Sequence, residues 1–377
     1  MTIHIKRIDL FVVDLPMTEP FKISFGTVSS RRLVIVKLTD ADGCEGWGEA
    51  ATLDLPIYKA DFPETVIAVI ERAVWPAIQA HGAFASPEAF DDHLNFIRGH
   101  YFAKAALSMA VYDIAAQKAG KSIAAYIGGE ATNITLSRTL SIMPDVRTML
   151  AKADEMASAG FRYLKLKIAQ GSDYAFAKAL RDAYPDFPIM VDANAGYALN
   201  DESIALFRKM DDLNHFCLEQ PLVWNDIVDH AKLQKEIRTP IALDESVDAF
   251  HDLEQALVLG SCKMLNIKVP RVGGLTAARR MYDLCLKNGI AAWVGGMIEG
   301  PIGLAAVMVF STLKGFKYPA DYIDPHYLIE DFAGYFKKPP YMLSGDQLTP
   351  NFEKHGLGLE IDYDRLCHRA VLSKSLS

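Results

Sequence analysis

The sequence lacks a long apolar run, a cluster of cysteines and a block of charge of one sign. No apolar stretch in its 377 residues approaches the roughly 18 residues that cross a bilayer. The N-terminal segment MTIHIKRIDLFVVDLP interrupts its apolar residues with charges, whereas a signal peptide needs a continuous apolar core. These absences predict a cytoplasmic protein with no membrane partner.

The cysteine and charge patterns exclude further classes. The five cysteines form no C-x-x-C pair, so neither a zinc knuckle nor a disulfide scaffold is indicated, and we expect reduced thiols: Cys44, Cys217, Cys262, Cys285 and Cys367. The formal net charge is -8 and no basic run is present, which argues against a nucleic-acid partner.

Half of the residues are apolar, which is enough for one large core and a smaller companion domain. From residue 1 to 130 we expect an α+β domain, because RLVIVKLTDADGCEGWGEA reads as a hairpin and residues 63–120 have helical periodicity. Residues 131–325 form the second domain, and residues 326–377 are expected to pack back on the first.

Short apolar strands alternate with amphipathic helices in the second domain. Strands are predicted near 135–141, 162–168, 188–192, 215–219, 240–244, 263–268, 290–295 and 316–320. Eight such units indicate an α/β fold, a (β/α)₈ (TIM-like) barrel, although an open doubly wound sheet has similar local patterning.

Polar residues interrupt the apolar runs at one recurring place, the carboxyl end of each predicted strand. Lys167, Asp192, Glu219, Asp244 and Lys268 follow one another at steps of 24 to 27 residues (167, 192, 219, 244, 268), or one β/α unit each. In a barrel all five would converge at the C-terminal mouth, where catalytic residues of this architecture lie.

The three acids of this series form an oxygen-only set. Oxygen ligands suit a hard cation such as Mg²⁺, and without a cation three neighbouring anions would repel one another. Taken singly, each acid is more simply explained as a loop residue or a helix cap; the regular spacing favours a shared site.

The lysines suggest what such a site does. On a strand, Lys165 and Lys167 point to the same face. Neighbouring positive charges lower the pKa of a lysine towards the range of a general base, and a metal stabilises the anion formed when a proton leaves the carbon beside a carboxylate.

Five motifs give the sequence a resemblance to a known family: KLKI, VDANAGY, LEQPL, LDES and NIKVPRVGG. In this order and spacing they resemble the enolase superfamily, in its muconate lactonizing enzyme subgroup. The resemblance covers nearly the whole chain, including VGGMIEGPIG after the seventh strand, and implies that the N-terminal domain caps the barrel. Lys268 argues against the mandelate racemase subgroup, which typically has a histidine late in the barrel.

The resemblance implies roles for the strand-end residues. Asp192, Glu219 and Asp244 would bind Mg²⁺, with Mn²⁺ able to substitute. Lys167 and Lys268 would be the acid and base on opposite faces of the substrate, and Lys165 would tune Lys167. Supporting polar groups would be Asn194, Glu245 and Glu299.

Within the subgroup, residues 20–31 and 49–62 of the capping domain would face the substrate. With VGGMIEGPIG they look most like the o-succinylbenzoate synthase and N-acylamino acid racemase group. The substrate-binding residues so implied are Phe21, Phe25, Leu55, Ile57, Tyr58, Gly296, Met297 and Ile298. The chain departs from that group's pattern at Pro270, Pro301 and PADYIDPHY, residues 319–327.

The group implies an enzyme that removes the proton alpha to a small-molecule carboxylate through an enediolate. We expect o-succinylbenzoate synthase activity, a dehydration of the menaquinone pathway, with N-succinylamino acid racemisation as a second activity, in a homo-oligomer. The first alternative is a dipeptide epimerase, which commonly has an Asp-x-Asp late in the barrel where this chain has Asp321 and Asp324. Two other classes are a non-catalytic metal or carboxylate-binding barrel and a lyase that forms a Schiff base through Lys268.

Overall fold

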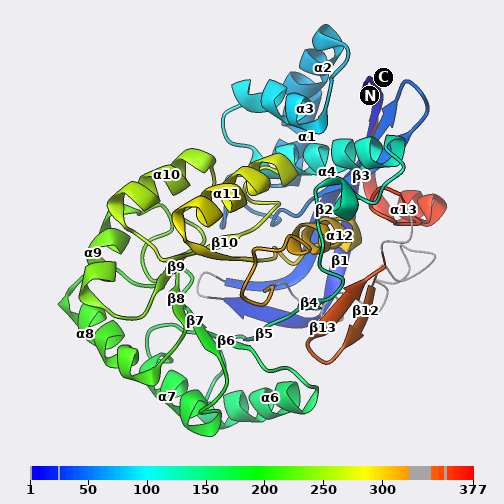
Figure 1. The fold of residues 1–377 in the computed structure, drawn as a ribbon. Coiled ribbons are helices and arrows are strands. Elements are labelled where there is room, and N and C mark those ends of the chain that lie inside the picture. Colours follow the sequence, from blue (N-terminus) through cyan, green and yellow to red (C-terminus); the bar gives the residue numbers. More distant parts are fainter. Residues whose placement is uncertain (1, 24–25, 322–340, 352–354) are drawn as a thin grey trace.

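The structure is a computed structural model that describes residues 2–23, 26–321, 341–351 and 355–377. It has a capping domain built on an antiparallel sheet and a barrel domain in which strands and helices alternate (Figure 1). The predicted class, a (β/α)₈-type barrel with an N-terminal α+β capping domain, is confirmed.

The capping sheet has the strand order β14-β1-β2-β3, in which β14 is the C-terminal strand Ala370–Leu376. A turn at residues 41–44 joins β2 to β3, as predicted, and is closed by a 2.9 Å hydrogen bond from Gly43 N to the Asp40 carbonyl. Its first three strands are β1 (Ile5–Ile23), β2 (Gly26–Asp40) and β3 (Glu45–Ala50). The helices that follow are α1 (Pro63–Val69), a π turn (Ile70–Val74), α2 (Trp75–His81), α3 (Pro87–His93), α4 (Tyr101–Lys118) and α5 (Ile123–Tyr126).

Helix α4 lies directly against β3, and two glycines make this approach possible. A Cβ atom at Gly46 would lie 2.1 Å from the Ala110 carbonyl oxygen, and one at Gly48 would lie 1.8 Å from that of Ala106. Both distances are far inside van der Waals contact, so any side chain here would push the helix off the sheet. The two glycines of EGWGEA are therefore explained by the close packing of α4 on β3.

In the described part of the chain, the barrel contains seven parallel strands in the order β11-β10-β9-β8-β7-β6-β5. Residues 320 and 321 close the ring, because Ala320 bridges to Leu136 beside β5 and Asp321 bridges to Gly295 beyond β11. The strands are β5 (Arg138–Leu140), β6 (Leu164–Lys167), β7 (Ile189–Asp192), β8 (Cys217–Glu219), β9 (Ile241–Leu243), β10 (Met264–Ile267) and β11 (Ala291–Val294).

Helices surround these strands on the outside (Figure 1). They are α6 (Val146–Ser158), α7 (Tyr174–Ala183), α8 (Asp201–Met210), α9 (Val228–Glu236), α10 (Phe250–Leu259), α11 (Leu275–Asn288) and α12 (Pro301–Ser311). Side chains fill the interior of the ring, among them the buried cluster Met190, Cys217, Ala242, Met264 and Trp293. The barrel is therefore a packed core with its polar groups at one end.

The C-terminal segment contacts both domains. Strands β12 (Tyr341–Ser344) and β13 (Gln347–Pro350) form a small sheet with β4 (Ile134–Thr135). After α13 (Tyr363–Arg369), β14 (Ala370–Leu376) pairs antiparallel with β1 and becomes the edge of the capping sheet. The predicted boundary at residue 326 lies outside the described residues.

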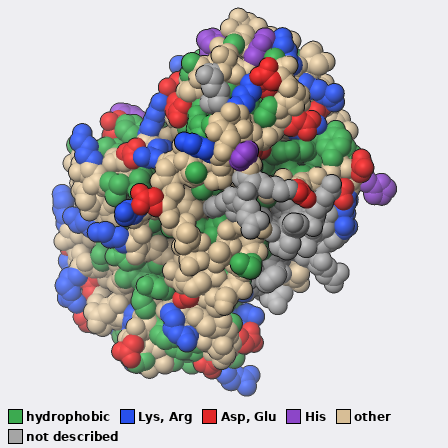
Figure 2. All heavy atoms as spheres, turned by 45° about the vertical axis from the view of Figure 1, so that its right-hand side comes forward, with side chains coloured by type: hydrophobic (Ala, Val, Ile, Leu, Met, Phe, Trp, Pro, Cys, Tyr) green, Lys and Arg blue, Asp and Glu red, His purple; other side chains and the backbone are tan. Residues whose placement is uncertain are grey.

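The surface in Figure 2 carries acidic and basic side chains interspersed over the described part of the chain. Among the described residues, no helix combines the length and apolarity needed to cross a membrane. All five cysteines are free thiols, and Cys217, Cys262 and Cys285 are buried.

A buried glutamate ties the capping domain to the barrel. Glu49 at the end of β3 is fully buried and accepts hydrogen bonds from the backbone N–H groups of Gly300 (2.7 Å) and Gly303 (3.0 Å), at the start of α12. A carboxylate at a helix N-terminus is stabilised by the helix dipole. Burial nevertheless raises the pKa of Glu49 to about 7, against the two backbone hydrogen bonds that lower it.

This shifted pKa predicts a pH-dependent stability that Glu49→Gln removes. Because the folded-state pKa is raised above 4.5 to about 7, proton binding stabilises the fold fully below pH 4.5, and this contribution is lost as the pH rises through 7. Between pH 5 and 8, the free energy of unfolding of the wild type should fall relative to that of Glu49→Gln by up to about 3 kcal/mol, at about 1.4 kcal/mol per pKa unit. Urea unfolding at several pH values measures this, and a difference that stays constant with pH would contradict it.

Candidate active site

The strand-end residues come together at the C-terminal end of the barrel. The parallel register sets Lys167 beside Asp192 and Asp192 beside Glu219, on β6, β7 and β8. Asp244 and Lys268 directly follow β9 and β10. All five are buried, and the three carboxylates have no exposed surface.

Lys165 and Lys167 lie on the same face of β6, as the alternation predicts, and share an acid. The Lys165 ammonium is 2.7 Å from Asp192 Oδ2, 2.6 Å from Glu219 Oε2 and 2.5 Å from Asp321 Oδ2. The Lys167 ammonium is 2.6 Å from the same Asp192 oxygen. Lys165 thus faces three carboxylates and Lys167 faces one.

The pKa values of the two lysines shift in opposite directions because their surroundings differ. Burial alone would lower the pKa of Lys165, but Asp192, Asp321 and Glu219 outweigh it and hold that pKa well above its usual value. Burial lowers the pKa of Lys167, with Lys165 adding to the lowering and Asp192 opposing it. Of the pair, Lys167 is the easier to deprotonate.

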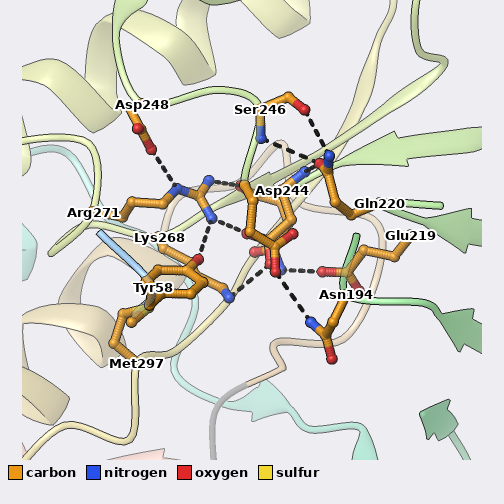
Figure 3. Close-up of polar contacts among 12 residues, drawn as sticks. Tyr58, Asn194, Glu219, Gln220, Asp244, Ser246, Asp248, Lys268, Arg271 and Met297 are labelled. Carbon is orange, nitrogen blue, oxygen red and sulfur yellow. Dashed lines mark hydrogen bonds and ion pairs between the residues drawn. The ribbon is translucent and has the colours of Figure 1, made fainter. Parts of the chain in front are cut away.

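Lys268 lies across the mouth from this pair. Its ammonium is 2.8 Å from Asp244 Oδ2 and 5.7 Å from the centre of the Tyr58 ring. The other Asp244 oxygen pairs with Arg271, whose guanidinium also donates 2.9 Å to the Asn266 carbonyl and contacts the Tyr58 hydroxyl (Figure 3). Although burial opposes it, the neighbouring Tyr58 and Glu245 raise the pKa of Lys268.

The supporting residues predicted from the sequence fall into two places. Asn194 donates 3.1 Å to Glu245 Oε1 beside Asp192, and burial raises the pKa of Glu245. Glu299 lies in the loop after β11, where it accepts 2.7 Å from the Met297 N–H. Asn194 and Glu245 therefore adjoin the carboxylates, whereas Glu299 shapes the loop.

Three further polar residues belong to the site and have no role in the sequence analysis. They are Arg271, Gln220 and Asn266, whereas Asp321 is named there only for the epimerase alternative. Gln220 accepts hydrogen bonds from the backbone N–H groups of Asp244 and Ser246, and Asn266 donates 2.7 Å to Glu219. Gln220, Asn266 and Arg271 do lie within motifs that mark the family, LEQPL and NIKVPRVGG, which is the signal that points to them.

The capping domain holds the loop that borders the site. Arg31, which is fully buried, donates hydrogen bonds of 3.0 Å to the Met297 carbonyl and 3.1 Å to the Ile298 carbonyl. Ile298 has a φ of 57°, a left-handed conformation that is costly for a β-branched residue. The Arg31 contacts thus keep a strained segment in place.

A cavity of about 80 Å³ lies between the lysines and this loop. Its lining includes Tyr58, Gly296, Met297 and Ile298 of the predicted substrate-binding residues. Leu55 and Ile57 are 63% and 55% exposed and do not line it. Phe25, Asp324 and the rest of residues 322–327 lie outside the described residues, as does the side chain of Phe21.

The acids fit a hard divalent cation by donor type. Asp192, Glu219 and Asp244 supply only oxygen atoms from a buried position, and Glu245 Oε2 is buried without a hydrogen-bond partner in the described part of the chain. No three His, Cys, Asp or Glu side chains among the described residues are gathered closely enough to hold a metal ion. In this structure the ammonium of Lys165 lies between Asp192 and Glu219. Lys268 and Arg271 neutralise Asp244.

Two family models match the chain. The "Enolase C-terminal domain-like" model covers residues 148–365, and the "Mandelate racemase / muconate lactonizing enzyme, N-terminal domain" model covers residues 7–128. Together they span the barrel and the capping domain.

Characterised relatives catalyse several reactions. The chain is 36% identical to an o-succinylbenzoate synthase of Geobacillus kaustophilus, over 85% of each chain, and 34% identical to an N-succinylamino acid racemase of Thermus thermophilus, over 84% of this chain and 85% of the racemase. It is 30% identical to an L-Ala-D/L-Glu epimerase of Bacillus subtilis, over 82% of this chain and 85% of the epimerase.

Among solved structures, an enolase superfamily member from Listeria innocua superposes with a TM-score of 0.94 at 30% identity, covering 99% of both chains. The sequence matches and the capped barrel agree with each other. The chain therefore belongs to the enolase superfamily of enzymes, in the family of mandelate racemase and muconate lactonizing enzyme.

Proposed function

We propose that this chain is a Mg²⁺-dependent o-succinylbenzoate synthase with N-succinylamino acid racemase as a second activity. The observation that supports the proposal is that Lys167 and Lys268, at the ends of strands four positions apart in the barrel sheet, both line one cavity, each beside a buried carboxylate. An o-succinylbenzoate synthase at 36% identity and an N-succinylamino acid racemase at 34% identity support the choice of substrates.

In this proposal Asp192, Glu219 and Asp244 hold the cation. A bound Mg²⁺ supplies charge stabilisation for the anion that forms when the proton alpha to the substrate carboxylate is removed. Substitution by Mn²⁺ and assembly into a homo-oligomer stay predictions.

Lys167, Lys268 and Lys165 have different roles in the proton transfer. Lys167, whose pKa burial lowers, removes the α-proton and in the dehydration returns it to the leaving hydroxyl. Lys268, whose pKa is raised, stays charged on the other face and stabilises the anion; in racemisation it delivers the proton there. Lys165 remains charged beside the carboxylates and keeps its neighbour's pKa low.

Dipeptide epimerisation is the second candidate. It is favoured by the 30% identical relative and by an acid late in the barrel. Asp321, however, is engaged by Lys165 at 2.5 Å and by the Thr139 hydroxyl at 3.1 Å, which leaves it poorly placed to grip a substrate amino group. We rank this activity below the other two.

A screen of three substrates with Mg²⁺ tests the proposal. Wild-type enzyme should dehydrate the hydroxylated precursor of o-succinylbenzoate fastest, racemise N-succinylamino acids more slowly and epimerise L-Ala-L-Glu least. Epimerisation as the fastest of the three reactions would contradict the assignment.

Metal dependence is the next expected outcome. EDTA should abolish activity, and Asp244→Asn should weaken Mg²⁺ binding and lower kcat by roughly a hundredfold or more, because the site loses one anionic ligand. Isothermal titration measures the affinity. Asp283→Asn, which breaks an exposed pair with Arg279, is the control and should bind Mg²⁺ normally. Full activity in EDTA would exclude the mechanism.

Substitution of the two lysines by arginine should abolish different reactions. Arginine keeps the positive charge but is not a usable base near neutral pH. We expect Lys268→Arg to wash α-deuterium out of one enantiomer of an N-succinylamino acid while losing racemisation. Lys167→Arg should lose that exchange and the dehydration as well. If Lys167→Arg dehydrates at close to the normal rate, Lys167 is not the base.

A further inference from the structure

The loop between β3 and α1, residues 51–62, reaches from the capping domain to the barrel mouth, and we call it the lid loop. Its tip is exposed at Leu55 and Ile57. Two consecutive residues after the tip, Tyr58 and Lys59, turn towards the barrel. Tyr58 lines the cavity, and Lys59 lies beside it without lining it.

Lys59 is bound to the barrel at two points. Its ammonium is 2.7 Å from Asp248 Oδ2 and donates 2.8 Å to the Glu245 carbonyl, in the loop that follows β9. It also lies 5.3 Å from the ring centre of Trp224, in the loop that follows β8. The Lys59 side chain is only 9% exposed, so this contact is largely shielded from solvent.

Asp248 connects this contact to the reacting groups. Its second oxygen, Oδ1, lies 3.5 Å from Arg271 Nε, and the same guanidinium pairs with Asp244 (Figure 3). Asp244 in turn pairs with Lys268. A continuous series of alternating charges therefore runs from the lid loop to Lys268.

The cavity is small with the lid loop in its observed position. About 80 Å³ is well below the roughly 300 Å³ or more of a typical ligand pocket. A substrate larger than this volume requires part of the wall to move. Tyr58 is the wall residue next to the Lys59 contact, so release of Lys59 loosens the wall at Tyr58, whose hydroxyl also contacts Arg271.

We propose that Lys59 and Asp248 form a latch that closes the lid loop over the site and, through Arg271, fixes Asp244 and Lys268 in their working positions. They are positioning residues, since neither touches the reacting atoms. The part played by Lys268 rests on the function proposed above, whereas the latch itself does not.

Hydrogen exchange of the substrate-free protein tests the latch. In Lys59→Met and in Asp248→Asn, backbone amides of residues 51–62 should exchange about tenfold faster, because a largely buried ion pair is lost. Lys59→Arg keeps the charge and should retain most of the protection. The double variant Lys178→Met with Asp182→Asn removes an exposed pair on α7 and should leave the lid loop unchanged.

Steady-state kinetics distinguish the loss of the Lys59 contact from the loss of the Asp248 contact with Arg271. Lys59→Met loses only lid closure, so KM for the dehydration substrate should rise roughly tenfold with kcat little changed. Asp248→Asn also removes one of the charges that position Arg271, so kcat should fall roughly tenfold as well, as expected when a reacting group is misplaced.

Unchanged exchange of the lid loop in Lys59→Met and Asp248→Asn would overturn the latch. Faster exchange with a normal kcat in Asp248→Asn would overturn its link to Lys268. If none of the three substrates reacts with the wild type, the proposed function fails, while the exchange measurement still decides the latch.

Discussion

Charge balance in a buried site is the constraint on which the rest of this structure depends. Three carboxylates without exposed surface, Asp192, Glu219 and Asp244, lie at neighbouring strand ends. Buried anions are tolerated only when they are paired. Lys165 and Lys167 pair with the acids of β7 and β8, and Lys268 and Arg271 pair with Asp244.

The same pairing gives chemically identical side chains different properties. Burial acts on both lysines, but three acids outweigh it at Lys165 and raise that pKa, whereas at Lys167 burial, with the neighbouring ammonium, outweighs one acid and lowers the pKa. A fold that needed these charges only for stability would gain little from such a difference, since a buried ion pair is weak evidence of stabilisation. Perturbed lysines in a cavity at strand ends fit the proton transfer proposed above.

The capping domain completes the site from outside the barrel. Arg31 holds the carbonyl groups of the strained loop at Met297 and Ile298, and Glu49 binds the start of the next helix. Lys59 and Tyr58 contact the opposite side. The barrel thus provides the charged groups, and the capping domain fixes the walls around them.

The sequence predicts the barrel and its strand-end residues well because the β/α unit has a regular length, so each acid or lysine recurs in the same place. Which charged side chains pair with one another could not be predicted in this way. The contact of Asp321 with Lys165 depends on how residues 320 and 321 close the ring, and that of Arg271 with Asp244 depends on a turn after β10.

The lid loop shows a second limit of sequence reasoning. Its apolar residues suggest a substrate-facing surface, but composition does not tell which side of a short loop faces inwards. Tyr58 lines the cavity, while Leu55 and Ile57 face solvent, and their substrate contacts stay a prediction. The charged residue Lys59, which composition gave no reason to single out, forms an ion pair with the barrel.

The most direct test of this account is the protonation of each lysine. Competitive acylation with a small reagent across a pH series, read by mass spectrometry after removal of divalent cations, gives a titration curve for each amine. The account predicts that Lys167 titrates below the usual lysine pKa and that Lys165 and Lys268 titrate above it. If Lys167 titrates at or above Lys165, the unequal charge environment does not select the base, and the mechanism built on it is wrong.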